Sequence, residues 1–387
     1  DVSGWEGADW YAGPGKVPSP GPLSWGRHDW FDQWASEHAA CRTGTALIDM
    51  SFMSKFMVSG ADAGRLLDRL STAKVDGDVG RISYTQWLNR KGTLEADLTV
   101  TKLAPEAFLV VVTDTMHRHA QTWMSRHLAD GGYAATVTDV TGGYAQINIQ
   151  GPTSREVLEQ LTDDDVSDEG FPFRTAREIA IGYARVTCTR ITYVGELGFE
   201  LFVPTEQAVH VYDKIAASGG VTHVGLKALS SLRLEKGYRD YGHDLDNTDT
   251  LLEAGLGFTA DLDKPGGFIG IDTVLQQKAF FKAHKGLPKR IVQVLVTDPA
   301  PLLYHGEVLL RDGVAVGDIR AGSYGHTLGG AVGLALVEGG AGGGGDGLVR
   351  KSWLDTGCWE IDIAGVKYPV KPSLRPLYDP RNERILK

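Results

Sequence analysis

Cysteine is scarce in this sequence, and its three copies are far apart. Cys41, Cys188 and Cys358 are the 3 cysteines among 387 residues, and no Cys-x-x-Cys pair or Cys/His cluster occurs. A disulfide scaffold and a structural zinc site are therefore not expected, and we predict no metal site. The low count suits a reducing compartment, so the predicted location is the cytoplasm, or the mitochondrial matrix if the source is eukaryotic.

Long apolar segments and an excess of positive charge are missing as well. No run approaches the roughly 20 apolar residues needed to cross a bilayer, and no signal peptide is visible. The 39 Lys and Arg against 49 Asp and Glu give a formal net charge of −10, which argues against nucleic acid or a membrane as a partner. A small anionic ligand stays open, because it needs only a local basic pocket.

The sequence also lacks a dinucleotide-binding fingerprint near its N-terminus. No Gly-x-Gly-x-x-Gly lies there between a strand and a helix, so we expect no FAD on this chain alone. The glycine-rich run at 339–347 fits that expression only trivially, and we predict a surface loop. The chain begins with Asp1 rather than Met, and we expect it to be processed, trimmed or part of something longer.

Periodicity predicts a mixture of helices and strands after an irregular arm at residues 1–24. Helical spacing lies at 28–41, 61–70, 114–128 and 206–217, with a Thr153/Glu156 capping box opening a further helix. Strand patterns lie at 47–58, 108–112, 134–138, 145–149 and 183–192. Beyond residue 290 the patterns are nearly all strands: 290–296, 307–311, 315–320, 331–336 and 359–363. We therefore predict an α+β fold with mostly antiparallel sheets and a small C-terminal β domain.

The segment 84–100 is the most informative part of the chain. It has the pattern of a strand, a turn and a second strand, with the turn residues at 89–92. Every second residue of the second strand is apolar: Leu94, Ala96, Leu98 and Val100. That alternation indicates a half-buried strand, and it sets one carboxylate, Asp97, among apolar neighbours. On pattern alone the segment is a hairpin with a polar outer face.

Two later segments also place charged residues in apolar surroundings. Residues 193–203 run through a glycine-containing turn into an apolar strand that carries Glu200. Residues 231–239 have helical spacing and carry Arg233 on a mostly apolar stretch, where an arginine needs a paired anion. The cations that follow in this segment are expected to be solvated: Lys236 and Arg239.

Together with the segments 241–246 and 252–256, these motifs resemble the tetrahydrofolate-binding aminomethyltransferase family, which includes the glycine cleavage T-protein. Residues 88–100 have the sequence Leu-Asn-Arg-Lys-Gly-Thr-Leu-Glu-Ala-Asp-Leu-Thr-Val. This motif is most similar to the folate-binding C-terminal half of sarcosine and dimethylglycine dehydrogenases. The resemblance runs from about Trp25 to the C-terminus, and the five motifs occur in the family's order.

The resemblance implies a three-domain cloverleaf in which the first two domains are discontinuous in sequence. After the arm at 1–24, two interleaved folate-binding domains are expected within 25–290. One would combine 25–55 with 145–245, and the other 56–144 with 246–290. The C-terminal β domain would span 291–387.

The resemblance also assigns roles to five residues. It implies Asp97 as the catalytic carboxylate, which would stabilise positive charge on an incoming carbon and move a proton. It implies Glu200 as the pterin-binding residue, because a carboxylate can accept bonds from N3–H and the 2-amino group together. Tyr193, Tyr84 and Arg233 match family residues at the folate; the alternatives are tyrosines of the core and an arginine paired with a protein carboxylate.

Five further residues could line the substrate pocket. Asp49 and Ser51 match a segment that borders it, although a capped turn after a strand would explain them equally well. Gln150 precedes a Gly-Pro pair and could face the pocket. His243 could face the substrate, the alternative being a hydrogen-bonded loop histidine. Tyr324 could close the site from the C-terminal domain.

The function implied is tetrahydrofolate-dependent one-carbon transfer. The expected donor is a small molecule, with the iminium derived from an N-methyl amine favoured, and a flavin domain or subunit is a candidate partner. Thr93 and Ala96 depart from the T-protein pattern, which weakens the case for a lipoyl-bound donor. Two alternatives stay open: a folate-dependent enzyme that demethylates aromatic ethers or opens methylenedioxy groups, and a non-catalytic regulatory binding module of the same fold.

Overall fold

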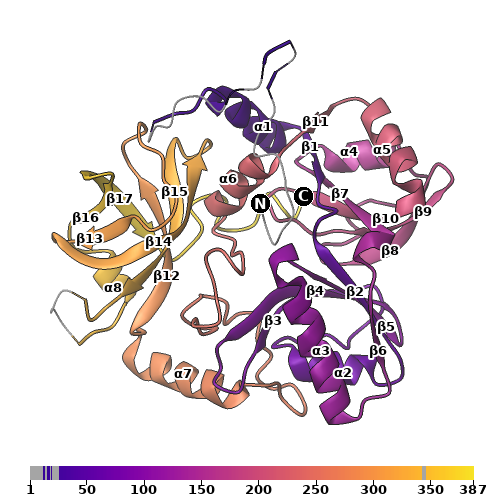
Figure 1. Ribbon diagram of the computed structural model, residues 1–387, viewed down its shortest axis with the longest axis horizontal. Coiled ribbons are helices and arrows are strands. Elements are labelled where there is room, and N and C mark those ends of the chain that lie inside the picture. The colour runs from indigo at the N-terminus through magenta and orange to yellow at the C-terminus, as the bar shows by residue number, and fades with distance from the viewer. Residues whose placement is uncertain (1–11, 14, 18, 20–25, 342–345) are drawn as a thin grey trace.

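The computed structural model describes residues 12, 13, 15–17, 19, 26–341 and 346–387. Figure 1 shows three groups of strands, each with its own helices, set around the middle of the molecule. The pairs formed between named strands are antiparallel except for β1 with β11, so the predicted α+β cloverleaf is confirmed. Within the described residues, every helix is too short or too polar to cross a bilayer.

The first lobe is built on a six-stranded sheet with the order β11-β1-β7-β10-β9-β8. Its strands are β1 Thr45–Asp49, β7 Tyr144–Gln150, β8 Ala176–Ile181, β9 Ala184–Thr189, β10 Gly198–Pro204 and β11 Val221–His223. Helices α4 (Ser154–Glu159) and α5 (Ala208–Ala217) contact β10. The apolar core of this lobe includes Ile149, Phe171, Phe199 and Leu201.

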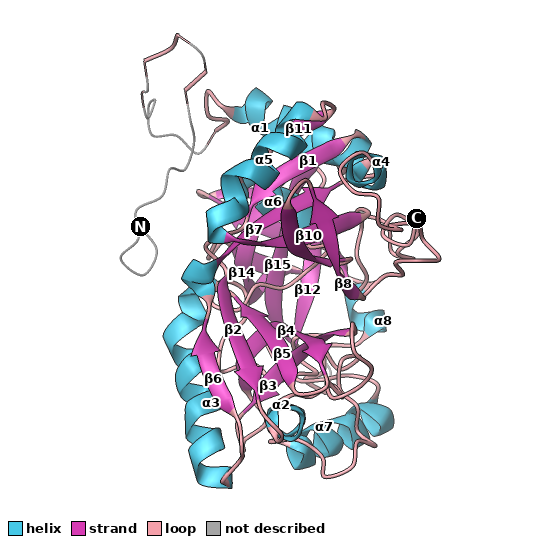
Figure 2. Cartoon of the chain, turned by 90° about the vertical axis from the view of Figure 1, so that its right-hand side faces the viewer, coloured by secondary structure: helices cyan, strands magenta, loops and turns pink. Residues whose placement is uncertain are grey.

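The second lobe is a five-stranded sheet with the order β3-β4-β5-β2-β6. Its strands are β2 Ser54–Ser59, β3 Ile82–Leu88, β4 Leu94–Ala104, β5 Ala107–Val112 and β6 Thr136–Asp139. Helices α2 (Ala63–Leu70) and α3 (His117–Gly131) supply apolar residues to its core, and α3 lies alongside the sheet in Figure 2. Ala96, Leu98 and Val100 are buried in that core, so the predicted half-buried strand is confirmed.

The third lobe is a closed barrel with the strand order β12-β15-β14-β13-β16-β17. Its strands are β12 Lys289–Val296, β13 Val308–Arg311, β14 Val314–Gly325, β15 Gly330–Glu338, β16 Trp359–Ile363 and β17 Val366–Ser373. The other helices are α1 Phe31–Thr43, α6 Leu226–Glu235, α7 Ile271–His284 and α8 Lys351–Leu354, with 3₁₀ turns at Asp114–Met116, Thr141–Gly143 and Thr205–Gln207. Helix α6 packs between α1 and the barrel strands β14 and β15.

Two local predictions were wrong, and one strand was missed. The strand expected over 47–58 is two strands in different sheets, because the chain turns at 50–53 and passes from the first lobe to the second. The strand expected over 183–192 is β9, and its hairpin partner β8 was missed. The Thr153 side chain does not cap α4; its hydroxyl instead bonds the hydroxyl of Thr45 at 2.7 Å.

The arm at 1–24 lies largely outside the described residues, as do residues 342–345 of the glycine-rich run. The domain boundaries drawn within 25–290 and at 291 stay predictions.

A buried network of charges joins the first lobe, α6 and the barrel. Arg42, near the end of α1, donates to Glu196 at 3.2 Å and to Glu235 at 2.9 Å. Glu235, the last residue of α6, also accepts the backbone N–H of Thr327 from the barrel at 2.8 Å. Arg384 in the C-terminal segment donates to the second oxygen of Glu196 at 3.0 Å. Segments far apart in the sequence therefore meet at two carboxylates.

The neighbouring Lys236 corrects another prediction. It was expected to be solvated, yet it is buried and donates to the carbonyl and carboxylate oxygens of Asp379 at 2.6 and 3.0 Å. A partner that lies 143 residues further along the chain leaves no local mark in the sequence, so helical spacing alone could not reveal it.

Replacing Glu235 by glutamine tests how much the buried network contributes. The substitution keeps the shape of the side chain but leaves Arg42 with less negative charge around it, and we expect the free energy of unfolding to fall by about 3 kcal/mol. Denaturant unfolding followed by circular dichroism measures the change. Glu206→Gln, at an exposed position, is the matched control. A loss for Glu235→Gln no larger than the control's would contradict the prediction.

Candidate active site

Asp97 lies on β4 and is held by two uncharged side chains of β3. Its Oδ2 accepts the hydroxyl of Tyr84 at 3.0 Å, and its Oδ1 accepts Nε2 of Gln86 at 2.8 Å. Gln86 is directly opposite Asp97 in the ladder between the two strands. The strand register therefore fixes the position of the carboxylate, and both of these hydrogen-bond donors are neutral.

Burial changes the proton affinity of Asp97. Desolvation raises the pKa of Asp97 to about 7, because the bonds from Gln86 and Tyr84 offset it only in part. The negative charges of Asp244 and Asp240 act in the same direction as desolvation. Asp97 as a whole residue is half-buried. A desolvated carboxylate with a pKa near 7 suits proton transfer near neutral pH.

Helix α6 and the turn that follows it supply the charged groups near Asp97. Arg233 donates to the carboxylate of Asp244, and to the carbonyl of Tyr238 at 3.0 Å. Its other terminal nitrogen is 4.0 Å from the carboxylate of Asp240. Arg233 thus has protein carboxylates as its partners, and its predicted contact with folate stays a prediction.

Arg239, predicted to be solvated, also lies in this group. Its guanidinium donates to the carbonyls of Gly237 and, at 3.0 Å, Ala254. Desolvation lowers the pKa of Arg239, while the charges of Asp244 and Asp97 oppose that shift. The prediction was wrong because these acceptors come from the turn after α6 and from a later loop.

Tyr193 belongs to the same neighbourhood. Its hydroxyl donates to the carbonyl of Arg239 at 2.6 Å, and its ring stacks on Tyr238 with centroids 6.0 Å apart. Desolvation raises the pKa of Tyr193 well above its usual value, and the charges of Asp240 and Asp97 add to that shift. Tyr193 therefore lies in the same neighbourhood as Asp97 and Tyr84, and a shared role of the three at folate stays a prediction.

Glu200 lies on β10 and is held by amide groups of β7. Its two oxygens accept Nδ2 of Asn148 at 3.2 Å and Nε2 of Gln146 at 3.4 Å. Desolvation raises the pKa of Glu200 to about 7, with the bond from Asn148 and the charge of Lys55 opposing it. Lys55 comes from β2 of the second lobe, so the electrostatic environment of Glu200 includes both lobes.

Side-chain packing shows that the face of the first-lobe sheet that carries Glu200 is turned toward the face of the second-lobe sheet that carries Asp97. Phe202, two residues after Glu200, packs in one apolar cluster with Val111 of β5. Val111 is opposite Thr99 in the ladder of β4 and β5, and Thr99 shares a face with Asp97 because alternate strand residues point the same way. The two carboxylates are therefore on facing surfaces of the first and second lobes.

Three buried amides on β7 form part of the site that the sequence analysis did not assemble. Gln146, Asn148 and Gln150 lie on the face of β7 that carries the contacts to Glu200. Within the described chain, the side-chain oxygen of each has no hydrogen-bond partner. An unpaired buried acceptor costs about 1–3 kcal/mol, so three together indicate a place for N–H donors of a ligand. The alternation of amides with isoleucines at 146–150 was the signal that could have revealed them.

Gln150 was singled out in the sequence, and its amide nitrogen is occupied. Nε2 donates to the carbonyls of Ile191 and Phe199, both at 3.4 Å. Gly198 is its partner in the ladder, and a Cβ at Gly198 would clash with the Gln150 side chain. Glycine at this position leaves room for the amide beside Glu200.

Three other predicted pocket residues form local turns. The carboxylate of Asp49 accepts the N–H of Ser51 at 2.9 Å, which is the capped turn of the alternative interpretation. The charge of Asp49 also acts on Lys55. His243 is 53% exposed and lies 3.5 Å from the carboxylate of Asp240, whose hydrogen bond raises the pKa of this histidine.

Tyr324, on β14, contacts α1, α6 and the loop at Pro299. Its ring lies edge-on to Phe31 with centroids 5.0 Å apart, and its hydroxyl donates to the carbonyl of Pro299 at 3.1 Å. The residue is buried, and the contacts found for it include neither Asp97 nor Glu200. A role at the substrate stays a prediction.

Comparison with known families and proteins identifies the family. The model of the GCVT N-terminal domain matches residues 1–264, and the model of the glycine cleavage T-protein C-terminal barrel domain matches residues 289–379. An aminomethyltransferase of Clostridium botulinum is 32% identical over 80% of this chain and 82% of its own length. The chain belongs to the folate-dependent aminomethyltransferase family of the glycine cleavage T-protein.

Two other relatives are longer oxidising enzymes. The 4-methylaminobutanoate oxidase (formaldehyde-forming) of Paenarthrobacter nicotinovorans is 40% identical over 100% of this chain and 45% of that protein. The mitochondrial dimethylglycine dehydrogenase of Homo sapiens is 32% identical over 100% of this chain and 43% of that protein. This chain therefore spans less than half the length of these relatives. The crystal structure of aminomethyltransferase T from Bartonella henselae shares the fold, with a TM-score of 0.77 at 22% identity over 90% of each chain.

The chemistry of the site fits a reduced pterin. A pterin presents an N3–H and a 2-amino group side by side, and the carboxylate of Glu200 can accept both. The unpaired oxygens of Gln146 and Asn148 add acceptors for the remaining N–H groups. Tyr193 and Tyr84 supply aromatic surface near Asp97. The donor-rich edge of the ring and the acceptor-rich face of the first lobe are therefore complementary.

Neutral replacements of the two carboxylates should stabilise the ligand-free protein most at high pH. Folding raises the pKa of Asp97 and of Glu200 to about 7. The protonated carboxyls therefore contribute to the free energy of unfolding, and this contribution is full below their unfolded-state pKa values and is lost as the pH rises through about 7. We expect the gain from Asp97→Asn or Glu200→Gln to be about 2 kcal/mol larger near pH 8 than near pH 5.

Unfolding curves of the wild type and the two variants at both pH values measure this difference. Asp78→Asn, at an exposed carboxylate, is the control, and its effect should not change between the two conditions. A gain that is the same at both pH values would show that the carboxylates titrate normally in the folded protein.

Proposed function

We propose that this chain transfers a one-carbon unit from a small donor to tetrahydrofolate. The favoured donor is the iminium formed by oxidation of an N-methyl amine, and the product is 5,10-methylene-tetrahydrofolate, with the amine released. Tetrahydrofolate, when bound, supplies the two nitrogens that accept the carbon. The observation that carries the proposal is the pair of desolvated carboxylates, Asp97 and Glu200, on facing surfaces of two lobes.

Glu200 binds and orients the pterin. Its ionised carboxylate accepts the two adjacent N–H groups of the ring, and a charge-assisted bidentate contact of this kind fixes the ring in its plane. Gln146 and Asn148 hold the carboxylate in place from β7. Their unpaired oxygens accept further N–H groups of the ligand, so the same side chains position Glu200 and contact the ring.

Asp97 acts on the carbon and on the proton. In its ionised form it stabilises the positive charge of the incoming donor, and it accepts the proton that leaves when the carbon is transferred. The bonds from Tyr84 and Gln86 keep the carboxylate at one position, which satisfies the requirement that reacting groups be held in line. A pKa near 7 makes both protonation states of Asp97 accessible at neutral pH.

The names of the relatives support an N-methyl amine as the source of the carbon. Two relatives are a 4-methylaminobutanoate oxidase described as formaldehyde-forming and a dimethylglycine dehydrogenase, and both named compounds carry N-methyl groups. In this proposal a flavin domain or subunit oxidises the amine, and the present chain captures the carbon. Demethylation is then the sum of the two steps.

Replacing Asp97 by asparagine should abolish transfer and leave folate binding largely intact. Asparagine cannot carry the negative charge or accept the proton, whereas the contacts at Glu200 remain, so we expect folate affinity within about tenfold of the wild type, which is about 1.4 kcal/mol. The assay supplies a methylated amine oxidised in situ by a flavin amine oxidase and detects 5,10-methylene-tetrahydrofolate by mass spectrometry.

The matched control is Glu95→Gln, which changes a carboxylate two positions earlier on β4 that pairs with His119 at 2.9 Å. Unchanged turnover in Asp97→Asn would reject the catalytic role. Consumption of an aromatic methyl ether with tetrahydrofolate alone, and no product from the amine, would favour the ether-demethylating alternative instead. Absence of any folate binding in the wild type would favour the non-catalytic module.

The affinity for tetrahydrofolate should depend on the protonation of Glu200. The bidentate contact needs the ionised carboxylate, and the pKa of Glu200 is raised to about 7, so wild-type binding should weaken about tenfold for each unit of pH below that value. Glu200→Gln should bind more weakly at about pH 8 and lose this dependence. Fluorescence titrations between about pH 6 and pH 8 measure both. A variant that keeps the wild-type pH dependence would contradict the role of Glu200.

A further inference from the structure

A lysine is fully buried in the second lobe, where that lobe meets the first. Lys55 lies on β2, and its Nζ donates to the carbonyls of Ser51 and Met53 at 2.9 and 2.6 Å. In the described part of the chain this ammonium forms no ion pair with a carboxylate, whereas the buried Lys236 pairs with Asp379 at 3.0 Å. Because a buried charge is costly without an opposite charge, the positive charge of Lys55 must be balanced at longer range.

The side chain of Lys55 lies on the face of its sheet that is turned toward the first lobe. Lys55 is opposite Val111 in the ladder of β2 and β5, and residues directly opposite each other in a ladder share a face. Val111 packs with Phe202 of β10, which is two positions after Glu200 and on the same face of that strand. Lys55 is therefore on the surface that meets the strand of the proposed pterin-binding carboxylate.

A chain of hydrogen bonds joins Lys55 to Glu200 through the turn at 50–53. The carbonyl of Ser51 accepts from Lys55, and the hydroxyl of Ser51 accepts the backbone N–H of Gln146 at 3.1 Å. The side chain of Gln146 donates in turn to Glu200 at 3.4 Å. The turn that Lys55 holds is therefore bonded to the β7 residue that holds Glu200.

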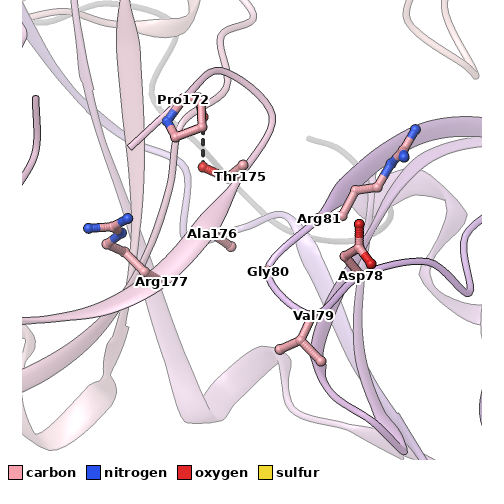
Figure 3. Close-up of a pocket in the computed structure, with 8 residues that line it drawn as sticks. All are labelled: Asp78, Val79, Gly80, Arg81, Pro172, Thr175, Ala176 and Arg177. Atoms are coloured by element: carbon pink, nitrogen blue, oxygen red, sulfur yellow. Dashed lines mark hydrogen bonds between the residues drawn. The ribbon is translucent and has the colours of Figure 1, made fainter. Parts of the chain in front are cut away.

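The first and second lobes also meet at the pocket drawn in Figure 3, which has a volume of about 350 Å³. Residues 78–81 of the second lobe form one wall, and first-lobe residues around Ala176 form the opposite wall. The N–H of Ala176 donates to the carbonyl of Gly80 at 2.6 Å. Lys55 and the turn at 50–53 are not in the lining of this pocket, so their contacts are a separate connection between the lobes.

The charge of Lys55 acts on Glu200, and the charge of Glu200 acts on Lys55. Desolvation lowers the pKa of Lys55 to about 8, and the charges of Asp49, Glu200 and Asp139 oppose that shift. The ammonium is thus charged at neutral pH. In the other direction, the charge of Lys55 opposes the rise in the pKa of Glu200 that desolvation causes.

Other titratable groups surround this pair, and they are Asp49 of β1, Asp139 of β6, His117 of α3, Tyr144 of β7 and Cys188 of β9. Bonds from Thr141 and His117 outweigh desolvation and lower the pKa of Asp139. Burial raises the pKa of the Cys188 thiol. Asp139 and Cys188 therefore keep one charge state near neutral pH, and Lys55 is the cation whose charge acts on Glu200.

We propose that Lys55 is a positioning residue for the pterin: its positive charge keeps the carboxylate of Glu200 ionised, and its hydrogen bonds hold the turn that supports Gln146. The inference rests on the proposed function and adds to it a residue that acts through Glu200. The bidentate contact to the ring needs an ionised carboxylate. A fully buried ammonium supplies the opposite charge without occupying the space of the ligand.

The first test compares Lys55→Gln with Lys55→Arg. Glutamine keeps N–H donors for the two carbonyls but removes the charge, whereas arginine keeps the charge. Wild-type affinity for tetrahydrofolate should weaken below about pH 7, and we expect this threshold to rise by about one pH unit in Lys55→Gln and to stay in place in Lys55→Arg. Fluorescence titrations between about pH 6 and about pH 9 measure the affinities.

The matched control is Lys102→Gln, which changes a lysine of β4 in the same sheet that is paired with Asp76 at 2.6 Å. It should leave the threshold unchanged. A purely structural role of Lys55 would lower the affinity of Lys55→Gln by the same factor at every pH, and that result would overturn the inference. A threshold that moves as far in Lys55→Arg as in Lys55→Gln would also overturn it.

The second test needs no folate and leaves Lys55 in place, so it decides the case even where the lysine variants do not fold. NMR of isotope-labelled lysine follows the titration of Lys55 in the ligand-free wild type and in Glu200→Gln. Because coupling between two sites is reciprocal, loss of the negative charge should lower the pKa of Lys55 by about one pH unit. Glu206→Gln, at an exposed position, is the control and should leave that pKa unchanged.

The outcomes separate this inference from the proposed function. An equal pKa of Lys55 in the wild type and in Glu200→Gln would overturn the inference, because the two charges would then not act on each other. An unchanged threshold in Lys55→Gln, in a protein that binds tetrahydrofolate, would overturn it and leave the proposed function standing. Absence of tetrahydrofolate binding by the wild type would overturn the proposed function, and the role of Lys55 with it.

Discussion

The guanidinium of Arg42, held between the carboxylates of Glu196 and Glu235, fixes the placement of the site residues. Glu196 lies four residues before Glu200 on the approach to β10, and Glu235 ends α6, which leads into the turn beside Asp97. That turn reaches the second lobe through Tyr241, whose hydroxyl donates to a carbonyl of β4 at 3.1 Å. No short loop connects Asp97 to Glu200, the two proposed ligand-binding carboxylates. The distance between them therefore depends on the long-range contacts of Arg42 and Tyr241.

Burial removes solvent from both Glu235 and Asp97, yet the pKa values of these two carboxylates shift in opposite directions. At Glu235, desolvation is outweighed by the bonds and charges of His38 and Arg42, and the pKa falls to about 2. At Asp97, the partners are neutral, and the pKa rises to about 7. A carboxylate with cationic partners stays ionised and serves structure, whereas one with neutral donors can change its protonation near neutral pH. The partners, rather than burial itself, separate structural acids from the proposed catalytic one.

Local patterns in the sequence predicted the strands well and the long-range contacts poorly. The alternation around Asp97 was enough to place its strand with one face in the core, because that signal is carried by adjacent residues. The turn at 50–53 was missed, since apolar residues continue through it from one sheet to the other. Lys236 was misjudged because Asp379 lies far along the chain. The unpaired oxygens of the β7 amides could be recognised only once their neighbours were known.

The position of Arg233 shows how a residue can matter to a site through another residue. The family resemblance placed it at the folate, and the structure pairs it with Asp244 and brings it near Asp240. Both of these carboxylates raise the pKa of Asp97. Because the positive charge of Arg233 lies against these two carboxylates, we expect it to offset part of their effect on the pKa of Asp97. Without Arg233, the pKa of Asp97 would be higher, and a smaller fraction of Asp97 would be ionised at neutral pH. An arginine can therefore influence the protonation of Asp97 without contacting a ligand itself.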